Sequence, residues 1–89
     1  MIKFNYPDDI QHMYTRRYCL RLAKALCRCL GGNVHAVVTD TGTAVHYVVM
    51  HNNVYIDIIG IFTRNQLLEY WRIQRPDVII SDIVCSRQL

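Results

Sequence analysis

Residues 44–61, AVHYVVMHNNVYIDIIGI, decide the fold. β-branched and aromatic residues lie on both sides of Asn52-Asn53, a pair that tolerates the positive φ angles of a two-residue hairpin turn. The stretch therefore predicts two antiparallel strands, over 44–51 and 54–61. A two-residue turn also sets the register of the hairpin. The predicted cross-strand pairs are His51 with Val54, Met50 with Tyr55, Val48 with Asp57 and His46 with Ile59.

The segments around this hairpin predict the other elements of an α+β fold. On the N-terminal side we expect a short strand near residues 2–4, one long helix over residues 10–30 and a strand over residues 34–39. The long helix begins after Pro7-Asp8-Asp9 and ends at Gly31-Gly32. On the C-terminal side, a capping box at Thr63 and Gln66 predicts a short helix that ends before Pro76, and residues 78–85 predict an edge strand. The residues of the short helix expected to face inward are Leu67, Leu68, Trp71 and Ile73.

Composition limits the class of protein. The chain has 89 residues, of which 52% are hydrophobic and 19% charged, so we expect one folded domain over residues 1–89 rather than a disordered tail. No apolar run approaches the roughly 18 residues of a membrane span, and the first nine residues lack a secretion core. The four cysteines are then expected as free thiols in the cytoplasm, with no membrane association.

One set of side chains combines groups used in catalysis. Alternation along the hairpin places His46 and Asp57 on one face, as diagonal neighbours about 7–8 Å apart at the backbone. If the long helix covers that face, Cys19 approaches His46. The imidazole would take the proton of the thiol, and the carboxylate would orient the imidazole. Tyr55 on the same face is an alternative partner for Asp57.

Three segments in this order resemble small proteins of the papain-like, transglutaminase-like fold. They are Cys19-Leu20-Arg21-Leu22-Ala23-Lys24-Ala25-Leu26, Val45-His46-Tyr47-Val48-Val49 and Tyr55-Ile56-Asp57-Ile58-Ile59-Gly60. The resemblance spans residues 19–71. It implies a minimal core of that fold, with Cys19 as nucleophile, His46 as base and Asp57 as the residue that orients the base.

The helical pattern gives Cys19 a less active setting than this family has. The predicted helix runs from residue 10 through Cys19 without a break, so the thiol would lie in mid-helix, away from the N-terminal N–H groups that lower a thiol pKa. Gln11 is the only nearby amide that could help to form an oxyanion hole. The alternative readings are a buried core thiol at Cys19 and a structural hydrogen-bonded pair of His46 and Asp57.

No cofactor and no metal site is predicted. Several potential ligands are scattered along the chain without the paired spacing of a zinc site. They are Cys27, Cys29, His35, His51 and Cys85.

Positive charge is concentrated in the N-terminal third. Residues 1–33 hold six of the ten cations and two of the seven acids. Four cations recur at helical spacing without an acid to pair with, and Arg16 flanks them. Together they form a basic stripe of Arg16, Arg17, Arg21, Lys24 and Arg28, with Tyr14 beside it. The stripe is either a solvated helix face or a docking surface for an acidic protein, a nucleoprotein or a nucleic acid.

Two functions follow from these features. The first is a binding protein that docks through the basic stripe, as a monomer or homodimer. Its size and charge are similar to those of phage anti-CRISPR inhibitors, whose partner is a CRISPR effector in the host cytoplasm. The second is a small cysteine hydrolase or acyl transferase that uses Cys19, His46 and Asp57. The mid-helix position expected for Cys19 favours the first.

Overall fold

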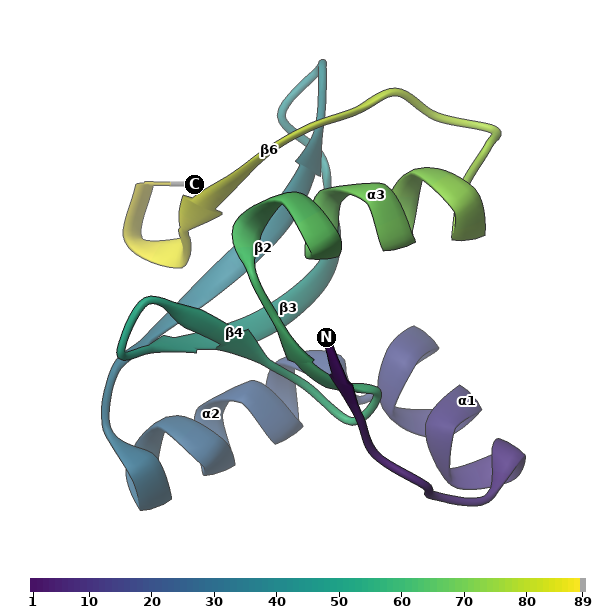
Figure 1. Ribbon diagram of the computed structural model, residues 1–89. Helices are drawn as coiled ribbons and strands as arrows, with labels where there is room; N and C mark the ends of the chain where they lie inside the picture. Colours follow the sequence, from purple (N-terminus) through teal and green to yellow (C-terminus); the bar gives the residue numbers. More distant parts are fainter. Residues whose placement is uncertain (89) are drawn as a thin grey trace.

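One antiparallel sheet organises the fold (Figure 1). The computed structural model describes residues 1–88, and within them six strands and three α-helices form an α+β fold, which confirms the predicted class. The strands lie in the order β1-β5-β4-β3-β2-β6, and all neighbours are antiparallel. Along the chain the elements are β1 (Ile2–Lys3), α1 (Asp8–Arg16), α2 (Cys19–Leu30), β2 (Asn33–Thr39), β3 (Ala44–His51), β4 (Val54–Ile56), β5 (Gly60–Phe62), α3 (Arg64–Gln74), β6 (Ile80–Cys85) and a short 3-10 helix (Ser86–Gln88).

The hairpin between β3 and β4 confirms the predicted turn. Asn52 and Asn53 have φ angles of 50° and 63°, as such a turn requires. The first two predicted pairs, His51 with Val54 and Met50 with Tyr55, are both present.

The single strand predicted over residues 54–61 is wrong, because the chain folds back at Asp57. Its carboxylate oxygen Oδ1 accepts hydrogen bonds from the N–H groups of Ile59 at 2.7 Å and Gly60 at 3.2 Å. Such side-chain bonds to the next N–H groups stabilise turns. The following residues then pair with β4 as β5, so the predicted pairs of Val48 with Asp57 and of His46 with Ile59 do not form.

The continuous helix predicted over residues 10–30 is also wrong. Arg17 and Tyr18 have φ angles of −115° and −116°, and the N–H groups of both donate to the carbonyl of Met13. A new helix, α2, begins at Cys19.

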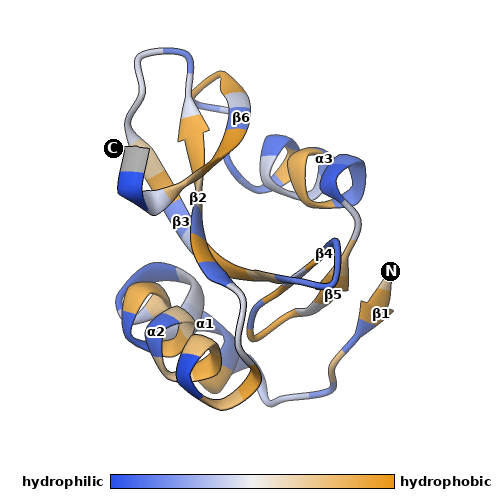
Figure 2. Cartoon of the chain, turned by 90° about the vertical axis from the view of Figure 1, so that its left-hand side faces the viewer, coloured by the Kyte–Doolittle hydropathy of each residue, from blue (hydrophilic) through white to orange (hydrophobic). Residues whose placement is uncertain are grey.

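The break lets both N-terminal helices reach the same core. A straight helix over residues 10–30 would be about 31 Å long. It would therefore be as long as the whole protein, whose longest dimension is 31 Å. With the bend, Ile10 and Tyr14 of α1 and Leu22 of α2 all pack against the main hydrophobic cluster. Figure 2 shows α1 and α2 on one side of β2 and β3, with α3 on the other.

Helix α3 begins with the predicted capping box. Thr63 accepts from the N–H of Gln66, and the Gln66 side chain accepts from the N–H of Thr63. Leu67, Leu68 and Trp71 are buried as predicted, but Ile73 is exposed because it lies on the opposite side of the helix. The predicted edge strand is confirmed as β6, which within residues 1–88 pairs with β2 alone. No described helix is long and apolar enough to cross a bilayer.

Candidate active site

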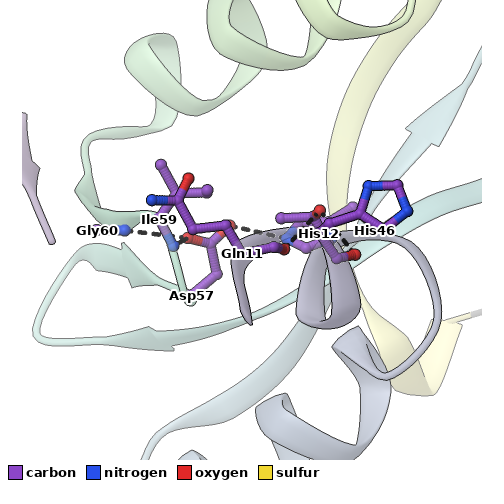
Figure 3. Close-up of polar contacts among 7 residues, drawn as sticks. Gln11, His12, His46, Asp57, Ile59 and Gly60 are labelled. Atoms are coloured by element: carbon purple, nitrogen blue, oxygen red, sulfur yellow. Dashed lines mark hydrogen bonds and ion pairs between the residues drawn. The ribbon is translucent and has the colours of Figure 1, made fainter. Parts of the chain in front are cut away.

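His46 and Asp57 form a buried hydrogen-bonded pair. His46 lies on β3 with no exposed surface, and Asp57 is 3% exposed in the turn between β4 and β5. The ring nitrogen Nε2 of His46 donates to the oxygen Oδ2 of Asp57 at 2.7 Å. In Figure 3, dashed lines mark the hydrogen bonds that the Asp57 carboxylate accepts from Ile59, Gly60 and His46. The structure thus brings together the two residues that the hairpin pattern placed on one face.

This hydrogen bond also defines the chemistry of the imidazole. An ionised carboxylate only accepts hydrogen bonds, so Nε2 carries the hydrogen and the other nitrogen, Nδ1, is the free base. Nδ1 is buried and has no hydrogen-bond partner within residues 1–88. It is therefore the atom of His46 that can take up a proton.

Trp71 of α3 covers the imidazole. Its indole stacks on the ring of His46 with 4.4 Å between the ring centroids and an angle of 29° between the planes. The predicted cover for this face was the long helix, and the structure places α3 there instead. Sequence reasoning identified Trp71 only as a core residue, since nothing in the helical pattern of residues 64–74 links it to His46.

Cys19 is the first residue of α2, so its predicted position in mid-helix is wrong. Tyr18 precedes the helix and makes no side-chain cap, so the first N–H groups of α2 have no acceptor within the helix. These N–H groups and the helix dipole favour a negative charge at this point. The break before α2 therefore places Cys19 at a helix N-terminus, the position that lowers a thiol pKa and that the continuous helix predicted from the sequence excluded.

The pKa values of Cys19 and His46 are shifted in opposite directions. Partial burial raises the pKa of the Cys19 thiol, but the nearby imidazole and the backbone N–H groups of Tyr47 and Leu20 outweigh this effect, so its pKa lies below the ordinary value of 9.0. Burial lowers the pKa of His46, but Asp57 and Cys19 together raise it above 6.5. Both shifts favour a thiolate beside an imidazolium ion.

Cys19 and His46 are close enough for each to shift the pKa of the other. Asp57 and Cys19 are the two groups that raise the pKa of His46, and Asp57 occupies Nε2. Nδ1 forms no hydrogen bond with any residue of the described span 1–88, although Cys19 is near enough to raise the pKa of His46. Catalytic hydrogen bonds are often long in free enzymes and shorten when substrate binds.

Two side chains predicted to be near the site have other partners. Gln11 donates from Nε2 to the carbonyl oxygen of Tyr6 at 2.7 Å, so this hydrogen bond competes with a role in an oxyanion hole. Tyr55 packs edge-on against His35 with 5.9 Å between the ring centroids. The partner of Asp57 is therefore His46. A neighbour that the sequence did not indicate is Tyr70, whose pKa is raised by burial and by the charge of Asp57.

The break in the helix divides the basic stripe. Arg16 and Arg17 lie at the end of α1, whereas Arg21, Lys24 and Arg28 lie on α2, and all five side chains are exposed. None of them forms an ion pair with another residue of the described span 1–88. The other predicted contact residue, Tyr14, is half-buried and packs against the core.

The remaining potential ligands do not assemble. Within residues 1–88, no group of three or more His, Cys, Asp or Glu side chains is arranged to hold a metal ion. Cys19, Cys27, Cys29 and Cys85 are free thiols.

Comparison of the chain with protein-family models, curated proteins and solved structures finds no match.

Proposed function

We propose that the protein is a thiol-dependent acyl-transfer enzyme, either a hydrolase or an acyl transferase. Cys19 is the nucleophile, His46 the base and Asp57 the residue that orients the base. The observation that carries the proposal is the position of Cys19 at the N-terminus of α2, beside an imidazole whose other nitrogen is held by a buried carboxylate. The resemblance to papain-like and transglutaminase-like proteins supports the same roles.

The first half-reaction acylates the thiol. The Sγ atom of Cys19 forms a bond to the carbonyl carbon of the substrate, and the electron pair of the C=O double bond moves onto the oxygen. When the pair returns, the bond to the leaving group breaks. The leaving group takes the proton that Nδ1 of His46 carries in the ion pair. The products are a thioester on Cys19, a neutral imidazole and the released leaving group.

The second half-reaction regenerates the thiolate. The neutral Nδ1 accepts a proton from water, or from an acceptor alcohol or amine, as its oxygen or nitrogen forms a bond to the thioester carbon. Collapse of this intermediate breaks the carbon–sulfur bond, and the ion pair of Cys19 and His46 returns. The hydrogen bond from Nε2 to Asp57 keeps Nδ1 directed at the sulfur through both steps.

The oxyanion is stabilised by the start of α2. The N–H of Cys19 belongs to the first turn, whose N–H groups have no acceptor within the helix. Groups of this kind stabilise the developing negative charge in acyl transfer.

Trapping the thioester tests the proposal. The protein is mixed with p-nitrophenyl acetate, and the labelled peptide is identified by mass spectrometry while release of p-nitrophenolate is followed. We expect a burst of one acetyl group per chain, carried by Cys19. Cys19→Ala should abolish the burst, whereas Cys29→Ala, which removes an exposed thiol from the same helix, should retain it. Equal labelling of all four cysteines would contradict the proposal.

A second candidate function is docking of the basic stripe on an acidic or nucleic-acid-bearing partner, as in the size and charge analogy with phage inhibitors. One observation favours it: the five exposed cations have no acidic partner within residues 1–88. Binding of a labelled DNA duplex and of polyglutamate, measured at increasing salt, tests this function. Binding should be lost in Arg21→Glu/Lys24→Glu and retained in Cys19→Ala. Binding that changes neither with salt nor with the double substitution would exclude docking through the basic stripe.

A further inference from the structure

A cavity of about 180 Å³ lies beside the proposed catalytic site. Its wall includes Trp71, which stacks on His46, and Val45, the neighbour of His46 in β3. The end of α1 contributes Thr15 and Arg16, a few residues before the nucleophile. Cys19, His46 and Asp57 do not line the cavity themselves, and the cavity adjoins the site through Trp71 and the end of α1. It has room for one side chain of an acyl substrate, but not for a long peptide segment.

The charge around this cavity is positive. Its lining includes two guanidinium groups, those of Arg16 and Arg75, and no acidic side chain from the described residues. Arg75 is already held by Asp77 through two hydrogen bonds of 2.9 Å. Arg16 forms no ion pair within residues 1–88. Arg16 thus presents an uncompensated charge at the cavity.

The remaining wall suits an aliphatic stem with a polar end. Most of the exposed lining is polar, and Val45, Tyr70 and Trp71 provide the smaller apolar part. The amide of Gln74 provides a further hydrogen-bond donor. Asp57 does not oppose an anion strongly, because its carboxylate is buried and accepts three hydrogen bonds. A short chain ending in a carboxylate matches these walls, with the methylene groups against the rings and the carboxylate at Arg16.

We propose that the substrate is an acidic peptide whose carboxylate side chain lies next to the reacting carbonyl, and that Arg16 selects it. This inference rests on the proposed function, because it names the substrate class of the same site. Arg16 acts through charge on the substrate and takes no part in proton transfer.

A matched pair of alkylating agents tests the selection without a known substrate. Iodoacetamide is neutral and iodoacetate carries a carboxylate, and each forms a sulfur–carbon bond to Cys19 while iodide leaves. The ratio of their rates at Cys19 measures the preference for an anion. Arg16→Gln should lower the ratio, and Arg16→Glu should lower it further, by about fivefold or more for a charge reversal within several ångströms.

Arg87→Glu is the control for the change in net charge. Arg87 is exposed and lines a hollow with Cys27 and Gly32 at the C-terminal end of α2, about 12 Å along the helix from Cys19. This variant should leave the ratio unchanged. An unchanged ratio in Arg16→Glu would overturn the inference, as would an equal fall in Arg87→Glu.

The rate with iodoacetamide alone separates the two proposals. A Cys19 no more reactive than the other three cysteines would refute the proposed function. A reactive Cys19 whose ratio of iodoacetate to iodoacetamide rates is the same in the Arg16 variants would refute only the substrate class. As a second measurement, coumarin amides of peptides ending in Glu, Gln or Lys should be cleaved in that order of kcat/KM. In Arg16→Glu the order of the Glu and Lys substrates should reverse, and an order that does not change would overturn the inference.

Discussion

Removing the carboxylate of Asp57 should destabilise the protein far more than removing an exposed carboxylate. Asp57→Ala leaves three donors without an acceptor, namely Nε2 of His46 and the N–H groups of Ile59 and Gly60, all in buried positions. Each unsatisfied buried donor costs about 1–3 kcal/mol. Since these costs do not add fully, we expect a loss of about 3–6 kcal/mol. A chain of this length has a total stability of about 4–13 kcal/mol, so Asp57→Ala should be largely or wholly unfolded.

Asp57→Asn separates the effect of the turn hydrogen bonds from the effect of the negative charge beside His46. The Asn oxygen can still accept from Ile59 and Gly60, so the turn between β4 and β5 remains. Its amide nitrogen is a donor, so Nε2 of His46 must become the acceptor and Nδ1 must carry the hydrogen. The loss of one charge-assisted hydrogen bond is expected to cost about 1.5–3 kcal/mol. The folded variant should also lose the reactivity of Cys19, because Nδ1 is no longer a free base.

Urea denaturation measures these effects. The fluorescence of Trp71, the single tryptophan, reports the packing around His46, and circular dichroism reports the helices. Asp77→Ala is the matched control, since Asp77 lies in an exposed pair with Arg75 and should leave the midpoint almost unchanged. Equal midpoints for Asp57→Ala and Asp77→Ala would refute the account of the Asp57 turn.

Three further predictions concern the same site. The raised pKa of His46 contributes stability that is fully present below about pH 6.5 and is lost as pH rises through the pKa of the folded state. The lowered pKa of Cys19 contributes stability that grows as pH rises from the pKa of the folded state to about pH 9. Urea midpoints of Cys19→Ser should therefore fall over this range more steeply than those of the unaltered protein, and parallel profiles would argue against coupling of the two groups. The fluorescence of Trp71 should be quenched as pH falls through the raised pKa of His46, because protonated imidazole quenches a stacked indole; a transition at the same pH in Asp57→Asn would contradict this. Gly60→Ala should destabilise the fold by about 2 kcal/mol or more in urea denaturation, because its Cβ would lie 2.0 Å from the carbonyl oxygen of Ile2. Gly42→Ala, where φ is 82° but no atom of the described residues lies within 4 Å, should cost about 1–2 kcal/mol, and a larger loss there than at Gly60 would be inconsistent with the close approach of β1.

Local chemistry allowed parts of the fold and site to be predicted. The turn at Asn52 and Asn53 depends on residues that tolerate positive φ, and the start of α3 depends on a reciprocal pair of hydrogen bonds at Thr63 and Gln66. Both signals lie within a few residues. The pairing of His46 with Asp57 followed from the hairpin, although Asp57 reaches the imidazole from a turn and not from a continuous strand.

The features that were not predicted depend on tertiary structure. No Gly or Pro marks the break at Arg17 and Tyr18, because the bend is stabilised by packing of both helices on one core rather than by a local breaker. The stacking of Trp71 on His46 joins residues from distant segments, which periodicity cannot detect. The fold-back at Asp57 did have a local signal. An Asp followed by Gly60 three residues later is typical of a turn, although apolar neighbours gave it the pattern of a strand.

The most direct test of the central claim is the rate of Cys19 alkylation by iodoacetamide as a function of pH, followed residue by residue with mass spectrometry. The other three cysteines serve as internal references in the same sample. We expect Cys19 to react well below the pH at which a thiol with the ordinary pKa of 9.0 ionises, and ahead of Cys27, Cys29 and Cys85. A Cys19 that reacts at the pH of the other thiols, or more slowly, would contradict the claim that α2 and His46 hold it as a thiolate.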